Sequence, residues 1–307
     1  KTILKILSKI DTLKNFCNLE VIVINDGSID GSTERLMKWH NETGNPSVKV
    51  LTQSAKGLSA GRQWAVEESR GEWVAITDID VRPEPDWIEM MMAEIQPIAD
   101  GESIVAVTGR TVFAHDGDVA SRVRSMEIAR KYRARPRRTS LANGPCSMFE
   151  RAALVSIGGF NPKWYHAEDM EVSLRLLQTG GVIIHTPAAV VHHVAESSLR
   201  IFLHKRSRDA RAHMRIRRHF GKHGVRKPNG AIHLHDFIAD AEDVVWMLPI
   251  AVFGLSLSIS FTEASPIDHM EFFLIYFDKT SLFNFVNFFE SFNNFLLIDL
   301  FKITAAA

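Results

Sequence analysis

The sequence predicts an α/β protein in which a mostly parallel sheet is flanked by helices. Two apolar segments, at 21–24 and 73–77, have the length and β-branched content of strands buried on both faces. Each segment is followed by carboxylates, Asp26 after the first and Asp78 and Asp80 after the second. Ligands of open α/β sheets bind beyond the carboxyl ends of the strands, so we expect these three side chains on one rim.

Strand and helix patterns alternate along the first hundred residues. Strands are predicted at 19–24, 48–51, 73–77 and 104–108, and helices at 32–39, 59–69 and 86–95. Asp30 or Ser32 caps the first helix, the second ends near Gly71, and Pro83 and Pro85 precede the third. This alternation is typical of a parallel sheet covered by helices.

Length and composition suit one large domain with an appendage. The chain has 307 residues and a formal net charge of zero. We place the α/β domain at 1–227 and a hydrophobic helical region at 228–307. Two cysteines give no disulfide framework and suit a reducing compartment. The chain opens on an amphipathic helix pattern at 1–7 without methionine or a signal peptide, so we expect that its natural start is missing.

Two stretches concentrate basic residues. The first holds Arg122, Arg124, Arg130, Lys131, Arg133, Arg135, Arg137 and Arg138. The second holds Arg200, Lys205, Arg206, Arg208, Arg211, Arg215, Arg217, Arg218, Lys222, Arg226 and Lys227. Such stretches can clamp a diphosphate, face an anionic membrane, bind nucleic acid or simply form a solvated helix face. Few aromatic residues interleave with the arginines, so we expect no nucleic-acid partner.

The triplet Asp78-Ile79-Asp80 has the chemistry of a divalent metal site. Alternate residues of an extended chain point to the same face, so both carboxylates could approach one ion. Mg²⁺ and Mn²⁺ prefer oxygen ligands and are usually shared between one or two carboxylates and substrate phosphates. Such triplets also occur on solvated surfaces, but the position after a predicted buried strand favours a site for a nucleotide and a metal.

A second acidic pair, Glu168 and Asp169, precedes an apolar-periodic stretch that predicts a helix closed by Gly180. Acidic residues on the first turn of a helix can simply complement its dipole. Here they follow a glycine-containing loop at 158–162, so they could instead face a cleft. A carboxylate within hydrogen-bond reach of a hydroxyl could serve there as a general base.

Five short motifs, in this order, resemble those of family 2 glycosyltransferases. They lie at 25–32 (Asn-Asp-Gly-Ser-Ile-Asp-Gly-Ser), 56–62 (Lys-Gly-Leu-Ser-Ala-Gly-Arg), 78–80 (Asp-Ile-Asp), 143–145 (Asn-Gly-Pro) and 168–169 (Glu-Asp). Five ordered motifs are far more specific than any single one, and the resemblance covers about residues 1–225. It implies the GT-A fold, a nucleotide-sugar donor, a divalent cation and inversion at the anomeric carbon.

On the donor side, the resemblance implies that Asp26 binds the nucleotide base, with Arg62 beside it, and that Asp78 binds the ribose. Lys56 and Arg208 would also contact the donor nucleotide, and Arg208 would do so at the diphosphate. The charge that develops on a leaving phosphate needs such cations for neutralisation.

For the metal and the acceptor, the resemblance implies a second set of roles. Asp80 would bind Mn²⁺ or Mg²⁺, and His193, or its neighbour His192, would complete the metal site. Asp169 would take the acceptor proton, and Glu168 would orient the acceptor or the donor sugar. The remaining acceptor contacts would come from Asn143 and Gly144.

Two departures from the family pattern bear on activity. The family's first strand, which packs against the base, is expected to be missing, so the chain alone could be weak or inactive. Polymerising synthases carry Gln-x-x-Arg-Trp after the base, where this chain has His-Lys-Arg-Ser-Arg-Asp at 204–209. This difference favours transfer of a single sugar.

The last third of the chain is hydrophobic. The uncharged stretch 244–261 has borderline transmembrane length, and the phenylalanine-rich stretches 272–277 and 282–300 suit interfacial helices. The basic residues before them would place the domain at the cytoplasmic face of the inner membrane. The alternative is a soluble helical tail that packs on the domain.

These observations together predict a metal-dependent inverting glycosyltransferase. The expected donor is a nucleoside-diphosphate sugar, most simply a UDP-hexose, and the expected acceptor is a hydroxyl of a glycan or lipid-linked molecule. Two alternatives stay open: a binding module for a nucleotide or nucleic acid that has lost catalysis on the same fold, and a nucleotidyltransferase. A nucleotidyltransferase would typically show a glycine-rich phosphate loop near its start.

Overall fold

The computed structural model describes residues 19–96, 102–114, 119–194 and 199–221, together with 225, 226, 228, 232 and 233. All of them belong to the first of two compact units, Lys1–Asp240 and Ala241–Ala307. The helix expected at 1–7 and the hydrophobic stretches at 244–261, 272–277 and 282–300 lie outside the described residues. The domain boundary between 227 and 228 stays a prediction.

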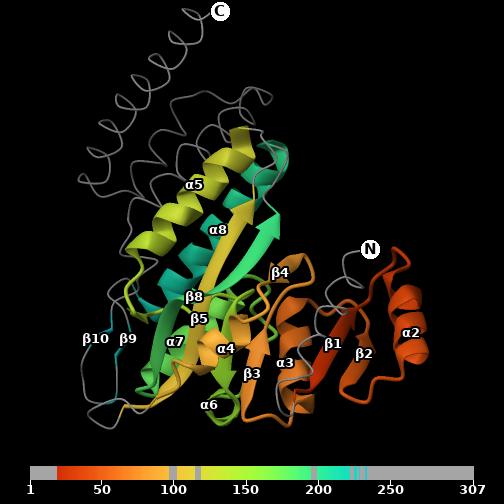
Figure 1. Cartoon of the computed structure of the whole chain (residues 1–307). Coiled ribbons are helices and arrows are strands. Elements are labelled where there is room, and N and C mark those ends of the chain that lie inside the picture. Colours follow the sequence, from red (N-terminus) through yellow and green to blue (C-terminus); the bar gives the residue numbers. More distant parts are fainter. Residues whose placement is uncertain are drawn as a thin grey trace, which may run out of the picture. The chain divides into compact units, whose positions relative to one another are not determined.

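A two-stranded parallel sheet begins the described chain (Figure 1). It pairs β1 (Val21–Asp26) with β2 (Val48–Gln53), and the register sets Asp26 opposite Gln53. Helices α2 (Ser32–Thr43) and α3 (Leu58–Glu68) follow these strands. The predicted alternation of strands and helices is confirmed here. Gly31, in the left-handed region, occupies the N-cap position of α2, and the Asp30 carboxylate accepts the N–H of Ser32 at 3.1 Å.

The larger sheet has six strands. In spatial order they are β3 (Trp73–Ile76), β7 (Ser147–Glu150), β5 (Ile104–Ala114), β8 (Val182–Val194) and β4 (Val81–Pro83), and β6 (Arg138–Thr139) also pairs with β8. A separate short pair joins β9 (Val225–Arg226) to β10 (Ile232–His233).

The larger sheet is mixed, so the expectation of a mostly parallel sheet was wrong. Strands β5 and β8 run parallel over most of their length, but β7 is antiparallel to both β3 and β5. Strands β4 and β6 are antiparallel to β8. Of the antiparallel strands, β4, β6 and β7 were not predicted: they are two to four residues long, and none carries an apolar run like that of β3.

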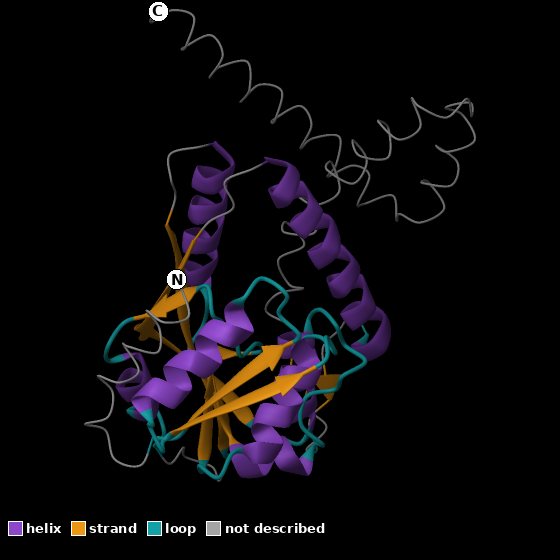
Figure 2. Cartoon of the chain, turned by 90° about the vertical axis from the view of Figure 1, so that its right-hand side faces the viewer, coloured by secondary structure: helices purple, strands orange, loops and turns teal. Residues whose placement is uncertain are grey.

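Helices cover both faces of the larger sheet, as Figure 2 shows for the described part of the chain. They are α4 (Trp87–Met92), α5 (Val119–Ala134), α6 (Arg151–Ser156), α7 (Glu168–Gln178) and α8 (Leu199–Phe220). Successive residues of a strand point to opposite faces. Phe149 and Ile183 therefore join one apolar core, whereas Met148 and Ile184 join the other.

The longest run of buried residues in a described strand lies in β5, and not in the two strands from which the fold was predicted. Residues 104–109 of β5 are buried in succession, whereas most of β1 and β3 is half-buried. Within the described ranges, we find no helix that combines the length and the apolar character needed to cross a membrane.

Candidate active site

Asp26 ends β1 and holds the loop that follows β2. Its carboxylate accepts hydrogen bonds from the Gln53 side-chain amide and from the backbone N–H groups of Lys56 and Gly57, each at 2.8 Å. Burial opposes ionisation of Asp26, but these three hydrogen bonds outweigh it and lower its pKa. A carboxylate has about four lone-pair sites, so one remains for a ligand N–H.

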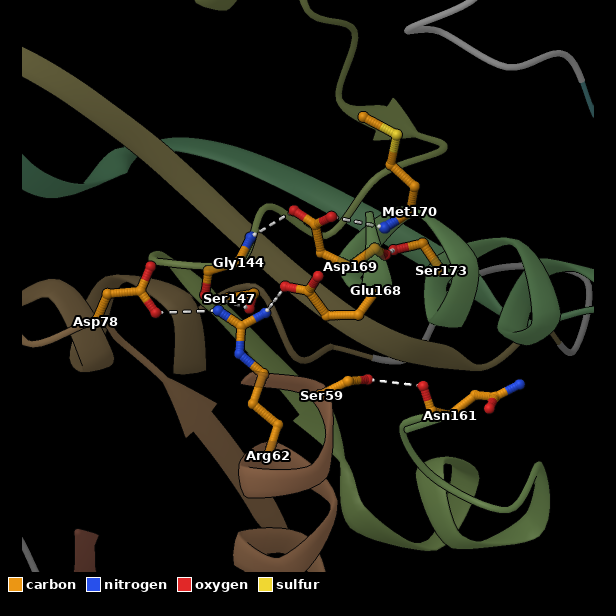
Figure 3. Close-up of polar contacts among 10 residues, drawn as sticks. All are labelled: Ser59, Arg62, Asp78, Gly144, Ser147, Asn161, Glu168, Asp169, Met170 and Ser173. Carbon is orange, nitrogen blue, oxygen red and sulfur yellow. Dashed lines mark hydrogen bonds and ion pairs between the residues drawn. The ribbon is translucent and has the colours of Figure 1, made fainter. Parts of the chain in front are cut away.

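Arg62 on α3 lies between carboxylates from two distant parts of the chain (Figure 3). Its Nη1 donates to Glu168 Oε1 at 2.6 Å, and its Nη2 donates to Asp78 Oδ1 at 3.0 Å. The side chains of Arg62 and Glu168 are both buried, at 7% and 8% exposure, whereas Asp78 is 30% exposed. The guanidinium also packs against Gly144, where an added Cβ would lie 3.0 Å from Nη2. The structure therefore places Arg62 at Asp78 and Glu168, and its predicted place beside the nucleotide base stays a prediction.

The electrostatics of Glu168 follow from its burial. Loss of solvent and the nearby charge of Asp169 raise the pKa of Glu168 to about 7, and Arg62 opposes this rise. For Arg62, burial acts to lower the pKa, but the carboxylates of Asp78, Glu168 and Asp169 outweigh it and raise the pKa. Arg62 therefore stays charged, and a single cation serves three acidic neighbours.

Asp169 is half-buried at the start of α7, where both of its oxygens are oriented by the backbone. Oδ1 accepts the N–H of Met170 at 2.8 Å, and Oδ2 accepts the N–H of Gly144 at 3.1 Å. The residue that caps α7, Ala167, has a φ of 60°. Among the described residues, Ala167 is the only residue other than glycine with a positive φ. Backbone outliers of this kind are concentrated at functional sites.

Gly144 belongs to the 142–146 loop, which connects β6 to β7. Ala142 N–H donates to Ser173 Oγ at 3.0 Å, and the same hydroxyl donates to the Asp169 carbonyl at 2.5 Å. Asn143 N–H donates to Thr108 Oγ1 at 3.0 Å. The loop is thus joined to α7 through Ser173 and Asp169, and to β5 through Thr108.

Asp80 and His193 lie together at a more open place. The turn after β3 carries Asp80, and β4 pairs with β8 so that Val81 lies opposite His193. His193 Nε2 is 3.4 Å from Asp80 Oδ2, with side-chain exposures of 16% and 60%. The imidazole stacks on Phe113 of β5, with ring centroids 4.8 Å apart. In the described ranges no group of three or more His, Cys, Asp and Glu side chains could hold a metal by itself.

The remaining predicted residues lie as follows. Arg208 on α8 donates to its neighbour Asp209, at 3.1 and 3.2 Å. Lys56 is exposed and contributes its backbone N–H to Asp26. The alternative metal residue, His192, lies 2.6 Å from Glu84 and not at Asp80.

Asn143 turns its side-chain amide toward Thr111 of β5 and Tyr132 of α5. Thr108, Thr111, Tyr132 and Ser173 were not among the predicted site residues. Ser173 could have been found, because it lies one helical turn after Asp169. For the other three residues, the sequence carries no local pattern that links them to the 142–146 loop.

The model of glycosyl transferase family 2 matches residues 1–158, which is half of the chain. This match includes Asp26, Arg62, Asp78 and Asp80, and it ends before the Glu168–Asp169 pair.

Several characterised or named proteins are similar over parts of the chain. EpsH of Bacillus subtilis (strain 168) is 32% identical over 123 residues, which cover 39% of this chain and 32% of EpsH. Chondroitin synthase of Pasteurella multocida (strain Pm70) is 27% identical over 164 residues, which cover 53% of this chain and 16% of the synthase. The chain thus spans less than half of the length of these curated relatives.

A solved structure is similar over most of the chain. Mannosyltransferase PcManGT from Pyrobaculum calidifontis, in complex with GDP-Man and Mn²⁺, superposes with a TM-score of 0.59 at 20% identity. The similarity covers 93% of this chain and 79% of PcManGT, and it confirms the α/β architecture. The chain therefore belongs to glycosyl transferase family 2, and its described part has the GT-A fold.

Proposed function

We propose that the chain is an inverting, metal-dependent glycosyltransferase that moves one sugar from a nucleoside diphosphate to a hydroxyl of a glycan or lipid-linked acceptor. UDP is the first nucleotide to test, with a hexose as the sugar. GDP is the second, because PcManGT is described in complex with GDP-Man.

One observation carries this proposal: Arg62 connects the two carboxylate groups that the chemistry needs. Asp78, at the predicted donor side, and Glu168, beside the predicted base, bind the same guanidinium at 3.0 and 2.6 Å. Asp169 follows Glu168 directly and is oriented by two backbone N–H groups. A donor that reaches Asp78 would therefore lie in one connected set of side chains with the base, which is the positioning that transfer requires.

Asp80 and His193 have the chemistry to hold Mn²⁺ or Mg²⁺. They provide one exposed carboxylate and one half-buried imidazole, separated by 3.4 Å. Metals of this kind are commonly shared between few protein ligands and substrate phosphates. When bound, the ion would neutralise charge that develops on the leaving diphosphate.

In the proposed step, the acceptor oxygen forms a bond to the anomeric carbon while the bond from that carbon to the diphosphate breaks. Asp169 takes the acceptor proton, and the nucleoside diphosphate leaves. A single displacement inverts the anomeric centre. Asp169 is suited to this role because it is half-exposed and its two backbone hydrogen bonds leave lone pairs on its carboxylate.

The proposed acceptor and the proposed location of the enzyme are each supported by one observation. The relatives include chondroitin synthase and a poly-beta-1,6-N-acetyl-D-glucosamine synthase of Staphylococcus aureus (strain COL), whose names favour a glycan acceptor. Helix α8 carries Arg217, Arg218 and His219 in its last turn, and such basic segments are attracted to anionic lipids. We therefore propose that the enzyme works at the cytoplasmic face of the membrane.

Calorimetric titration of the full chain with UDP, and separately with GDP, tests the donor site. We expect binding that requires Mn²⁺ and that falls at least about tenfold in Asp80→Asn, since Asp80 would hold the ion. Glu42→Gln is the matched control, because Glu42 is a carboxylate of similar exposure, 63% against 60%, on α2. Binding that is independent of both Mn²⁺ and Asp80, or no binding of either nucleotide, would overturn the donor assignment.

A further inference from the structure

Two residues outside the predicted site hold the side chain of Asn143. Its Nδ2 donates to Tyr132 OH at 2.6 Å and to Thr111 Oγ1 at 2.9 Å, so both N–H bonds of the amide are used. The Tyr132 hydroxyl also lies 3.4 Å from Thr111 Oγ1. These three side chains close a polar triangle between β5, α5 and the 142–146 loop.

The triangle is held rigidly by its surroundings. Thr111 is 3% exposed and lies on β5, the central buried strand. The Tyr132 ring stacks on His185 of β8 at 5.9 Å, and the Arg135 guanidinium lies 5.1 Å above the same ring. Unlike an exposed side chain, Asn143 thus has one well-defined position relative to the sheet.

The position of Asn143 also determines how the carboxylate of Asp169 is held. The residue after Asn143 is Gly144, whose N–H donates to Asp169 Oδ2 at 3.1 Å. Asn143 also accepts the Cys146 N–H on its carbonyl at 3.1 Å, which closes the loop as a turn. A movement of the Asn143 side chain therefore moves the peptide group that orients Asp169.

We propose that Thr111 and Tyr132 are positioning residues for sugar transfer, which act through Asn143 and Gly144 on Asp169. The inference rests on the proposed role of Asp169 as the base. It also assigns Asn143 a role through its loop, because Thr111 of β5 and Tyr132 of α5 take both N–H donors of its amide. Thr111 and Tyr132 do not contact the base and need not touch a substrate.

The physical reason is geometric. A base works when its oxygen is within hydrogen-bond reach of the proton that it takes, and errors of about 1 Å can cost on the order of 100-fold in rate. Loss of a buried hydroxyl leaves the Asn143 amide with an unpaired N–H, which favours another side-chain position. Donor binding at Asp26 and Asp78 involves other hydrogen bonds and should be unaffected.

Matched variants separate this role from general stability. Thr111→Val removes the hydroxyl at nearly constant volume, Thr111→Ser keeps it, and Tyr132→Phe removes the other hydroxyl but keeps the ring against His185. The control is Ser69→Ala, which removes a buried hydroxyl that bonds within another part of the fold, at the Val66 carbonyl.

Two readouts are measured on the full chain: the hydrogen exchange rate of the Gly144 amide, and kcat and KM for sugar transfer. We expect Thr111→Val and Tyr132→Phe to accelerate Gly144 exchange and to lower kcat about 10- to 100-fold at unchanged donor KM. Thr111→Ser and Ser69→Ala should stay within about twofold of wild type.

The outcomes distinguish this inference from the proposed function. A wild-type chain that binds nucleotide but transfers no sugar would count against the proposed function. Unchanged Gly144 exchange in both Thr111→Val and Tyr132→Phe would overturn the positioning role by itself. Faster exchange with unchanged kcat would overturn it as well, because the loop would then be held for stability alone.

Discussion

The two acidic clusters of the site differ in what holds them. Around Arg62, two of the three charged side chains are less than 10% exposed, and protein hydrogen bonds fix them at 2.6 and 3.0 Å. At Asp80, the carboxylate is 60% exposed, and its distance to His193 is 3.4 Å. Protein contacts hold the first cluster, whereas we propose that a bound ligand completes the second.

This difference indicates which substitutions should change folding stability and which should change ligand binding. Breaking a buried ion pair leaves an uncompensated charge in a poorly solvated place, which costs about 3–5 kcal/mol. An exposed pair contributes about 0–1 kcal/mol, because water and salt screen it. Substitutions at Arg62 should therefore be felt in folding, and substitutions at Asp80 should be felt in ligand binding.

The largest expected effect is on chemistry. Asp169→Asn should lower kcat about 10²- to 10⁴-fold, since an amide cannot accept the acceptor proton. The amide oxygen can still accept the Gly144 N–H, so nucleotide affinity should stay within about twofold of wild type. Steady-state kinetics and nucleotide titration of the same preparation measure both. If Asp169→Asn weakened donor binding as much as Asp80→Asn, the division between the clusters would be wrong.

The second effect is on stability. Arg62→Met should lower the free energy of unfolding by about 3–5 kcal/mol, because Glu168 and Asp78 lose their shared cation. Arg70→Met is the control: Arg70 is 89% exposed and pairs with Glu20 at 3.6 Å, so its loss should cost about 1 kcal/mol or less. Urea unfolding of the two variants gives the comparison. Equal costs would show that burial does not distinguish the two pairs.

The sequence predicted the positions of charged residues better than the contacts between them. Motifs at strand ends and at the start of α7 indicated Asp26, Asp78, Asp80 and Asp169, because a strand or helix end fixes where a residue lies. The partners of Arg62 could not be predicted, since Glu168 is 106 residues away along the chain. Long-range pairing depends on how the helices pack, and no local pattern records it.

The sheet shows the same limit. Helix α3 and strands β1, β2 and β3 were predicted to within two residues at every end, because each has a recognisable apolar pattern. Strand β5 was predicted at 104–108 but continues to Ala114, through the more polar stretch that includes Gly109 and Arg110. There the parallel pairing with β8 continues past a register shift between Thr108 and Arg110. Pairing with a neighbouring strand thus extends β5 beyond the point where the strand propensity of its residues falls.

A third effect compares two histidines on β8 and depends on pH. His185 is 4% exposed, and burial, with the charges of Arg135 and Arg110, lowers its pKa to about 4. The unfolded chain protonates His185 near pH 6.5, so its contribution to stability is present above pH 6.5 and lost as pH falls through 4. The loss amounts to about 3 kcal/mol over that range. His185→Phe should remove this part of the acid dependence in urea unfolding at several pH values.

The control is a substitution at His193, the half-buried histidine of the two. His193→Phe should retain the acid dependence of unfolding, because His185 is unchanged. Like Asp80→Asn, it should weaken Mn²⁺-dependent nucleotide binding. An unchanged acid slope in His185→Phe would show that another group causes it.

The smallest effect concerns the turn that brings Glu168 and Asp169 into the buried cluster. Ala167 has a φ of 60° and a ψ of 29°, a left-handed conformation that costs a residue with a Cβ about 1 kcal/mol and costs glycine little. Ala167→Gly should leave the free energy of unfolding within about 1 kcal/mol of wild type, because relief of strain offsets the greater entropy of the unfolded chain. Ala167→Val should cost more than Ala167→Gly by about 1–2 kcal/mol, since a β-branched side chain is disfavoured in this conformation. If urea unfolding gave valine no penalty relative to glycine, the turn would not constrain α7, and the fixed position of Asp169 would depend on the hydrogen bonds of the 142–146 loop alone.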